Sequence, residues 1–199
     1  MPALSDLSFR VDLSSGTIAG APTMVRKLSD LAGSFADRRA LDAALHKGDP
    51  TVYSVASVQP ADDAGQLHYG LGRLMPGKIG DEYFLTKGHV HRRREAAEVY
   101  IGLKGRGLLL LENLETGAAA MLELSQQSVV YVPSATAHRT VNIGSEPLVY
   151  IGVYPADAGH DYETIAKENF HHVIVERNGA PALIARKKYL EELNRMREE

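Results

Sequence analysis

The chain has 199 residues, of which 44% are hydrophobic and 24% charged, which is the composition of a folded globular protein rather than a disordered one. Its formal net charge of -3 excludes the basic excess typical of a general nucleic-acid binder, and its lack of cysteine excludes disulfides, thiolate nucleophiles and cysteine-ligated metal sites. The eight histidines are therefore the main candidates for metal binding and acid–base chemistry.

The N-terminal part of the chain predicts one helix and no targeting segment. Residues 1–7 have neither a basic start nor a long apolar stretch, and no run approaches the roughly 18 apolar residues that span a membrane. We therefore expect a cytoplasmic protein that associates with neither membranes nor nucleic acids. Residues 34–46 have apolar side chains at helical spacing, with Ser34 or Asp37 as the N-cap, and residues 48–50 end this helix.

After this helix the sequence changes to short apolar runs separated by Gly, Pro, Asn and Asp, a pattern typical of a β-sandwich or β-barrel. Near the C-terminus, Asn178-Gly179 separates two such runs and predicts a type I′ hairpin. Residues 186–197 predict an exposed helix with Tyr189, Leu193 and Met196 along one side. The predicted strands are 52–58, 67–74, 99–103, 108–112, 119–124, 129–132, 139–142, 148–154, 172–177 and 182–185.

Two separate motifs carry candidate metal ligands. His89 and His91 are two residues apart, so an extended strand would place both imidazoles on one face. Glu98 lies at the start of the next predicted strand, just before residue 99, and His138 lies beside a later one, so a β-barrel would bring all four side chains together. An isolated His-X-His pair is often a surface feature, but the joint spacing favours a metal site. Three imidazoles and a carboxylate suit Fe, Mn, Ni or Zn and leave positions for water or substrate.

Two carboxylates compete for the fourth ligand position. Glu95 lies four residues after His91, and Glu98 lies seven after it. Glu98 shares strand parity with Tyr100, so both side chains would point into the barrel. We therefore choose Glu98 as the ligand and expect Glu95 to be a solvated charge beside Arg92–Arg94, a basic run to which we assign no function.

Candidate groups for chemistry on a bound ligand lie near the last predicted barrel strand. Tyr150, Gly152 and Tyr154 would share one face of that strand, so the Tyr154 hydroxyl would reach into the barrel. His160 follows six residues later, and its imidazole is suited to acid–base work because it titrates near neutral pH. Residues 86–88 offer a hydroxyl, an ammonium group and a glycine backbone to an anion, with the Lys side chain on the opposite strand face.

Together these motifs resemble the cupin superfamily, and within it the cupin-type phosphoglucose isomerases of archaea and some bacteria. The likeness runs from about Leu13 to about Gly179, and the Tyr154–Tyr162 segment is the most specific part because generic cupins lack it. The motifs that carry it are Arg26–Asp30, Pro76–Gly80, Thr86–His91, Ala97–Tyr100, Val129–Pro133, Ala137–Gly144 and Tyr154–Tyr162.

We accordingly expect an all-β fold, a cupin jelly-roll β-barrel with a few short flanking helices. We expect one cupin domain over residues 1–199, with a core barrel at about 51–155, an N-terminal extension at 1–50, and a C-terminal hairpin and helix at 170–199. The resemblance also implies a homodimer.

The function implied is metal-dependent interconversion of glucose 6-phosphate and fructose 6-phosphate in glycolysis and gluconeogenesis, with one divalent ion (Fe, Zn, Mn or Ni) per subunit. The expected metal ligands are His89, His91, Glu98 and His138. The expected catalytic residues are Glu98, Tyr154 and His160, with Tyr100 facing the substrate. The resemblance places four further residues near the phosphate, namely Tyr53, Thr86, Gly88 and Tyr162.

Two departures from the family pattern concern the pocket. Gly72 stands where the family can carry a threonine that contacts the phosphate, and Ala135 and Thr136 stand where it can carry aromatic residues. We therefore expect a roomier pocket with one phosphate contact fewer. Two alternative functions are a cupin dioxygenase that uses the same metal site and a non-catalytic sugar-binding cupin. The native metal, the choice between proton transfer and hydride shift, and activity on mannose 6-phosphate stay open.

Overall fold

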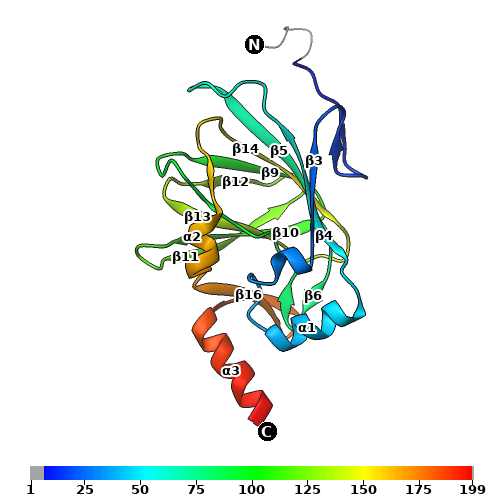
Figure 1. Cartoon of the computed structure of the whole chain (residues 1–199), viewed down its shortest axis with the longest axis vertical. Coiled ribbons are helices and arrows are strands. Elements are labelled where there is room, and N and C mark those ends of the chain that lie inside the picture. The colour runs from blue at the N-terminus through cyan, green and yellow to red at the C-terminus, as the bar shows by residue number, and fades with distance from the viewer. Residues whose placement is uncertain (1–6, 199) are drawn as a thin grey trace.

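The computed structural model describes residues 7–198, and β-strands dominate it. Figure 1 shows most strands as two facing layers, with α1, β16 and α3 gathered at the end where the C-terminus lies. This confirms the predicted all-β jelly roll with short flanking helices. Within residues 7–198 the two layers are separate hydrogen-bonded sheets rather than one closed sheet. Residues 1–6, part of the stretch that showed no targeting signal, lie outside the described range.

The larger layer is a six-stranded sheet in which every neighbouring pair is antiparallel. Its strand order is β12-β9-β14-β5-β4-β3, so β14 and β5 form its centre. Its strands are β3 (Thr23–Lys27), β4 (Thr51–Val58), β5 (Leu67–Leu74), β9 (Glu98–Lys104), β12 (Val129–Val132) and β14 (Leu148–Pro155).

The facing layer has the strand order β11-β10-β13. Two isolated bridges, Leu85↔Val141 and His89↔His138, add the chain around residues 85–91 beside β13, and β15 pairs with β8 beyond it. This layer therefore brings the two candidate metal-binding motifs side by side. Its strands are β8 (Val90–His91), β10 (Arg106–Asn113), β11 (Ala119–Ser125), β13 (Thr136–Asn142) and β15 (His160–Asp161).

Apolar side chains fill the space between the layers and also cover the outer face of the larger sheet. The main apolar cluster includes Leu74, Leu109 and Leu148, which are all fully buried. On the opposite face of the six-stranded sheet, the short hairpin of β1 (Val11–Asp12) and β2 (Thr17–Ile18) covers a second cluster, formed by Ile18 with Ala56, Leu71 and Val149. Both faces of the central strands are therefore buried, which fixes their register.

The predicted N-terminal helix is present as α1 (Arg38–Lys47). It begins after Asp37, whose side chain accepts a hydrogen bond from the Ala40 backbone nitrogen at 3.0 Å. Phe35 lies ahead of the helix and is buried in the main core. The helix therefore begins later than the predicted range, because the residue that caps it is Asp37 rather than Ser34.

The C-terminal hairpin and helix form a separate packing unit. Asn178 and Gly179 have φ values of 51° and 76°, which confirms the predicted type I′ turn between β16 (His172–Arg177) and β17 (Ala180–Ala185). Helix α3 (Arg186–Glu198) buries Tyr189 and Leu193 against this hairpin, whereas Met196 is 58% exposed, so the apolar stripe ends one turn earlier than predicted. The remaining elements are β6 (Lys78–Ile79), β7 (Glu82–Tyr83), the 3₁₀ turn η2 (Ser29–Leu31) and α2 (Tyr162–Glu168).

Strands β16 and β17 continue through β7 to β6 in a four-stranded sheet. Among residues 7–198 there is no helix with the length and apolar character needed to cross a bilayer.

Candidate metal centre and substrate cavity

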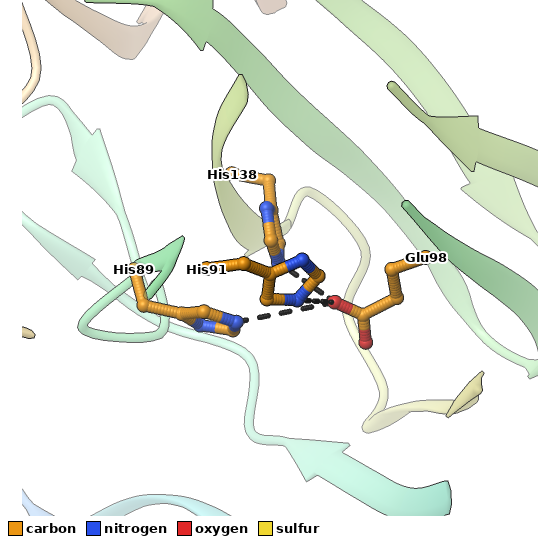
Figure 2. A group of neighbouring side chains, drawn as sticks. All are labelled: His89, His91, Glu98 and His138. Carbon is orange, nitrogen blue, oxygen red and sulfur yellow. Dashed lines mark ion pairs between the residues drawn. The ribbon is translucent and has the colours of Figure 1, made fainter. Parts of the chain in front are cut away.

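The four expected metal ligands point toward one another from both layers of the fold (Figure 2). Glu98 Oε2 lies 2.9 Å from His138 Nε2, 3.2 Å from His91 Nε2 and 3.9 Å from His89 Nε2. One possible ligand atom from each residue lies within 4.8 Å of the other three. Glu95, the competing carboxylate, is exposed. The structure thus assembles a His₃Glu group that fits a single metal ion.

Backbone pairing brings the two motifs together. The His89 nitrogen donates to the His138 carbonyl at 3.2 Å, and the His138 nitrogen donates to the His89 carbonyl at 2.9 Å. These reciprocal bonds lock the start of the first motif to the centre of β13. Glu98 is the first residue of β9 in the opposite layer, and its side chain crosses the interior to reach the histidines.

The atoms that face the centre of this group lack hydrogen-bond partners. Among the described residues, the Nε2 atoms of His89, His91 and His138 and the Oε2 atom of Glu98 are all buried without one. Burying several polar atoms without partners costs free energy, so native proteins rarely leave such groups unmatched. A bound cation would satisfy all four atoms together, which is the arrangement expected of a metal centre.

Hydrogen bonds of the Nδ1 atoms set the tautomers of His91 and His138 for metal binding. His91 Nδ1 lies 3.1 Å from the Ala96 carbonyl oxygen, and His138 Nδ1 lies 3.1 Å from the Thr136 carbonyl oxygen. A carbonyl oxygen only accepts hydrogen bonds, so each Nδ1 carries the hydrogen and each Nε2 presents a lone pair. Metal-bound histidines are commonly oriented by this kind of contact.

The charge state of the cluster also suits a cation. Burial raises the pKa of Glu98, but the adjacent His138 and His91 imidazoles outweigh burial and lower that pKa to about 2. Burial lowers the pKa of His89 well below its usual value, and the neighbouring histidines lower it further. At neutral pH the group therefore contains a carboxylate anion and a neutral His89, the forms in which these side chains bind metals.

A cavity of about 240 Å³ opens onto this cluster. It is lined by His89 and by every residue expected to be catalytic or to bind substrate, while His91 and His138 lie behind this lining with side chains 3% and 1% exposed. The expected residues on the lining are Tyr53, Thr86, Gly88, Glu98, Tyr100, Tyr154, His160 and Tyr162.

Strand alternation explains which side chains reach the cavity. On β14 the lining positions are Tyr150, Gly152 and Tyr154, the predicted inner face of that strand. The same two-residue period from Tyr53 along β4 leads to Val55 and Ser57, and Gln59 follows just beyond the strand. The sequence interpretation missed these further β4 residues, and also Met24 and Gly70, although parity from Tyr53 was a sufficient signal for Ser57.

His160 is held over the metal cluster by its own short strand. Strand β15 pairs with β8, which aligns His160 with His91. The His160 ring centroid lies 4.3 Å from that of His89 and 5.1 Å from that of Tyr154. Burial lowers the pKa of His160 and raises the pKa of Tyr154, so at neutral pH the imidazole is uncharged and the phenol keeps its proton.

The arginine run Arg92–Arg94 holds residues 157–161, the segment that carries His160, in place. Arg93 forms a 2.9 Å ion pair with Asp157, and Arg94 forms a 2.7 Å ion pair with Asp161. Backbone nitrogens of the same run donate to the carbonyls of residues 158 and 159. The run, to which the sequence had suggested no function, therefore anchors the chain on either side of His160.

The residues expected near a phosphate form a hydroxyl-rich wall of the cavity. Thr86 Oγ1 accepts a hydrogen bond from the Thr140 nitrogen at 3.0 Å. Gly88 has φ +74°, and a Cβ there would lie 2.7 Å from a ring atom of Phe170, so only glycine fits at this position of the cavity wall. The Lys87 side chain does not line the cavity, but its Nζ lies 5.5 Å from the centroid of the Tyr162 ring.

With the geometry established, comparison with known proteins identifies the family. The family model described as "Glucose-6-phosphate isomerase (GPI)" matches residues 25–190. The chain belongs to the glucose-6-phosphate isomerase family. This confirms the resemblance inferred from the motifs.

Curated members of the glucose-6-phosphate isomerase family match most of the chain. The glucose-6-phosphate isomerase of Pyrococcus furiosus is 48% identical over 170 residues, which are 85% of this chain and 89% of that protein. That of Pyrococcus horikoshii is 47% identical over 173 residues, which are 87% of this chain and 91% of that protein. Among solved structures, an oxalate oxidase is 12% identical with a TM-score of 0.48 and covers 58% of this chain and 57% of its own.

Proposed function

We propose that this member of the family interconverts glucose 6-phosphate and fructose 6-phosphate with one divalent metal ion held by His89, His91, Glu98 and His138. One observation carries the proposal: four buried donor atoms without partners converge at the wall of a hydroxyl-lined cavity. Relatives that are 41–48% identical over most of the chain are glucose-6-phosphate isomerases, which supports the isomerase over an oxygen-activating or a purely sugar-binding cupin.

The reaction moves hydrogen between C1 and C2 of the open-chain sugar and develops negative charge on the oxygens of these carbons. A divalent ion bound by the His₃Glu group supplies Lewis-acid stabilisation of that charge. The four ligand residues would hold the ion, and His89 and Glu98 are the two of them that line the cavity.

Tyr154 and His160 are the proton-handling groups of the proposed mechanism. The Tyr154 hydroxyl keeps its proton at neutral pH, so it donates a hydrogen bond to a sugar oxygen. His160 is uncharged, so it accepts the proton of the anomeric hydroxyl and returns it to the ring oxygen as the bond between that oxygen and the anomeric carbon breaks. Glu98 faces the same cavity, but its lowered pKa makes it a weak base. Deuterium uptake from heavy water at C1 or C2 distinguishes proton transfer from an internal hydride shift.

The phosphate group of the substrate is proposed to bind at the hydroxyl-rich wall. Thr86 and the Gly88 backbone line this wall together with Tyr53 and Tyr162. Burial raises the pKa of Tyr53, and it raises the pKa of Tyr162 to about 12, so both phenols keep their protons and donate. Several neutral donors converging on one dianion provide charge-assisted hydrogen bonds, which are stronger than neutral ones.

We also propose that the protein acts as a single-domain homodimer in the cytoplasm, within glycolysis and gluconeogenesis. Apolar residues are exposed on both edge strands of the larger sheet, with Val25 at 49% on β3 and Val129 at 67% and Tyr131 at 61% on β12. Exposed edge strands favour pairing with another chain. Size-exclusion chromatography with light scattering measures the molar mass of the protein in solution. A mass equal to that of one chain contradicts the dimer.

Metal removal tests the proposed activity directly. The protein is treated with a chelator, dialysed and assayed on fructose 6-phosphate with a coupled glucose 6-phosphate dehydrogenase, before and after single ions are restored. We expect activity to be lost on chelation and recovered with Fe, Zn, Mn or Ni. His89→Ala should lower bound metal and activity together, whereas His46→Ala, on exposed α1, should change neither. Full activity in metal-free protein would refute the proposal.

A further inference from the structure

The Tyr150 side chain lies over Gly72 on the neighbouring strand β5, where the lack of a side chain makes room for its ring. Gly72 and Tyr150 are direct partners in the β5–β14 pair. A Cβ on Gly72 would lie 2.3 Å from Tyr150 Cζ and 2.6 Å from its hydroxyl oxygen. Any side chain at residue 72 would therefore force the phenol to move. The Tyr150 ring occupies the space that the missing side chain leaves on the inner face of β5. The pocket is therefore not enlarged at Gly72, contrary to the expectation from the sequence.

The position of the Tyr150 hydroxyl suits a donor to substrate. Tyr150 lines the cavity together with Tyr53, Thr86 and Tyr162, the residues of the proposed phosphate wall. Burial raises the pKa of Tyr150, although a hydrogen bond with Thr140 opposes the rise. The phenol therefore keeps its proton throughout the neutral range and has a hydrogen to donate.

The Tyr100 ring contacts both the Tyr150 ring and the metal cluster. The centroids of the Tyr100 and Tyr150 rings are 5.5 Å apart, and the centroid of Tyr100 lies 5.7 Å from that of His138. The Tyr150 hydroxyl is hydrogen-bonded to Thr140, whose backbone nitrogen donates to Thr86 Oγ1, so the hydroxyl lies beside the proposed phosphate wall. It is therefore placed for the part of the substrate remote from the reacting carbons.

The cavity needs such a donor because its lining provides no formal positive charge from side chains. Among the described residues, no lysine or arginine lines it. Arg26 and Lys87 approach Tyr53 and Tyr162 without lining the cavity. The direct contacts to a phosphate bound there therefore come from neutral N–H and O–H groups, and each additional hydroxyl has a measurable effect.

We propose that Tyr150 is a further substrate-binding residue, whose hydroxyl donates to the phosphate of the sugar and which reaches the phosphate because residue 72 is glycine. This inference rests on the proposed function. The Tyr150 hydroxyl, from the neighbouring strand β14, would take the place of the phosphate contact that we expected to be lost at Gly72.

Tyr150→Phe tests the proposal because it removes the hydroxyl and keeps the ring. The probe is sorbitol 6-phosphate, which has no carbonyl group and therefore binds without reacting, and its Kd is measured by calorimetry on the metal-loaded protein. We expect a Kd at least about tenfold higher, as for the loss of a hydrogen bond to a charged group. The KM for fructose 6-phosphate should rise by a similar factor, while kcat and bound metal stay close to wild type.

Two comparisons make this result specific. Tyr131→Phe, at an exposed position on β12, should leave the Kd unchanged. Unphosphorylated sorbitol, measured by competition in the isomerase assay, should be affected less by Tyr150→Phe than sorbitol 6-phosphate is. An unchanged Kd for sorbitol 6-phosphate, or equal weakening for both probes, overturns the proposal.

Gly72→Ala tests the link between the two residues. The added methyl displaces the phenol, so the variant should lose about as much affinity for sorbitol 6-phosphate as Tyr150→Phe does. Adding Gly72→Ala to Tyr150→Phe should cost little more, since the hydroxyl is already absent, whereas strictly additive losses contradict the pairing. If wild-type protein with restored metal does not isomerise fructose 6-phosphate, the proposed function fails; if it does and Tyr150→Phe binds normally, only this inference fails.

Discussion

The Glu98 carboxylate lies over Gly152: a Cβ on Gly152 would come within 2.6 Å of Glu98 Oε1. Glu98 projects from β9 and Gly152 lies on the neighbouring β14. The carboxylate can reach the three histidines only because the adjacent strand has no side chain there. The metal site therefore depends on a residue that offers no ligand atom.

Gly152→Ala should consequently weaken metal binding. The added methyl pushes the carboxylate away from the histidines, and we expect a loss of at least about tenfold in metal affinity, the scale seen when groups that orient metal ligands are disturbed. Metal retained after dialysis against a weak chelator measures the effect. Gly33→Ala is the matched control, because a Cβ there meets nothing within 4 Å and its φ is not positive. Equal metal retention in both variants contradicts the prediction.

Tyr154→Phe should lower kcat and leave metal content and KM largely intact. The variant removes the proton that Tyr154 directs to a sugar oxygen, and the loss of a positioned acid–base group typically costs about 10²-fold or more in rate. Steady-state kinetics with metal analysis on the same sample gives the answer. A wild-type kcat would remove Tyr154 from the mechanism.

Thr86→Ala should mainly raise KM for fructose 6-phosphate, by about tenfold, because it removes one donor to the phosphate. The free energy of unfolding should also fall by about 1 kcal/mol, since the Thr140 nitrogen loses the Thr86 hydroxyl as its acceptor. Thr86→Ser retains the hydroxyl and should restore both quantities. An unchanged KM in Thr86→Ala with wild-type kcat would place the phosphate elsewhere.

Asp161→Ala should make stability less dependent on acidic pH. Asp161 caps α2, and hydrogen bonds from Thr164 and the ion pair with Arg94 lower its pKa to about 2 from an ordinary 3.8. Its contribution is therefore fully present above the ordinary value and is lost as the pH falls toward 2. We expect the variant to lose about 1 kcal/mol at neutral pH, as for a removed N-cap, and the difference from wild type to shrink in acid.

Denaturant unfolding at about pH 6 and about pH 2.5 measures this difference. Asp161→Asn keeps a side-chain oxygen for the cap and should lie between wild type and Asp161→Ala at the higher pH. A difference that stays constant across the two pH values would show that the Asp161 charge does not contribute to stability.

The strands that the sequence predicted best are those bounded by turn residues. Strands β5 and β12 have the predicted limits, 67–74 and 129–132. Strand β3 was missed because it is an edge strand whose side chains are mostly exposed, so it has no apolar alternation. Helix α2 was missed because it is short and polar and buries only Ile165. Its start depends on the Asp161 cap rather than on an apolar stripe.

Residue type and strand parity were enough to predict the candidate metal ligands and several of the side chains that face the cavity. Parity selected Glu98 over Glu95 and placed Tyr154 in the cavity. Neither type nor parity shows that Gly152 makes room for Glu98 or that Gly72 makes room for Tyr150, because both relationships join residues on neighbouring strands. They follow from the register of β14 with β9 and β5, which pairing between distant segments determines.

The ligand group draws its members from both layers, with Glu98 on the six-stranded sheet and His138 on the facing one. An ion held there would link the two sheets, so its binding free energy would add to the free energy of unfolding of the whole protein. Loss of the ion would then lower the stability of the folded protein against proteolysis as well as its activity.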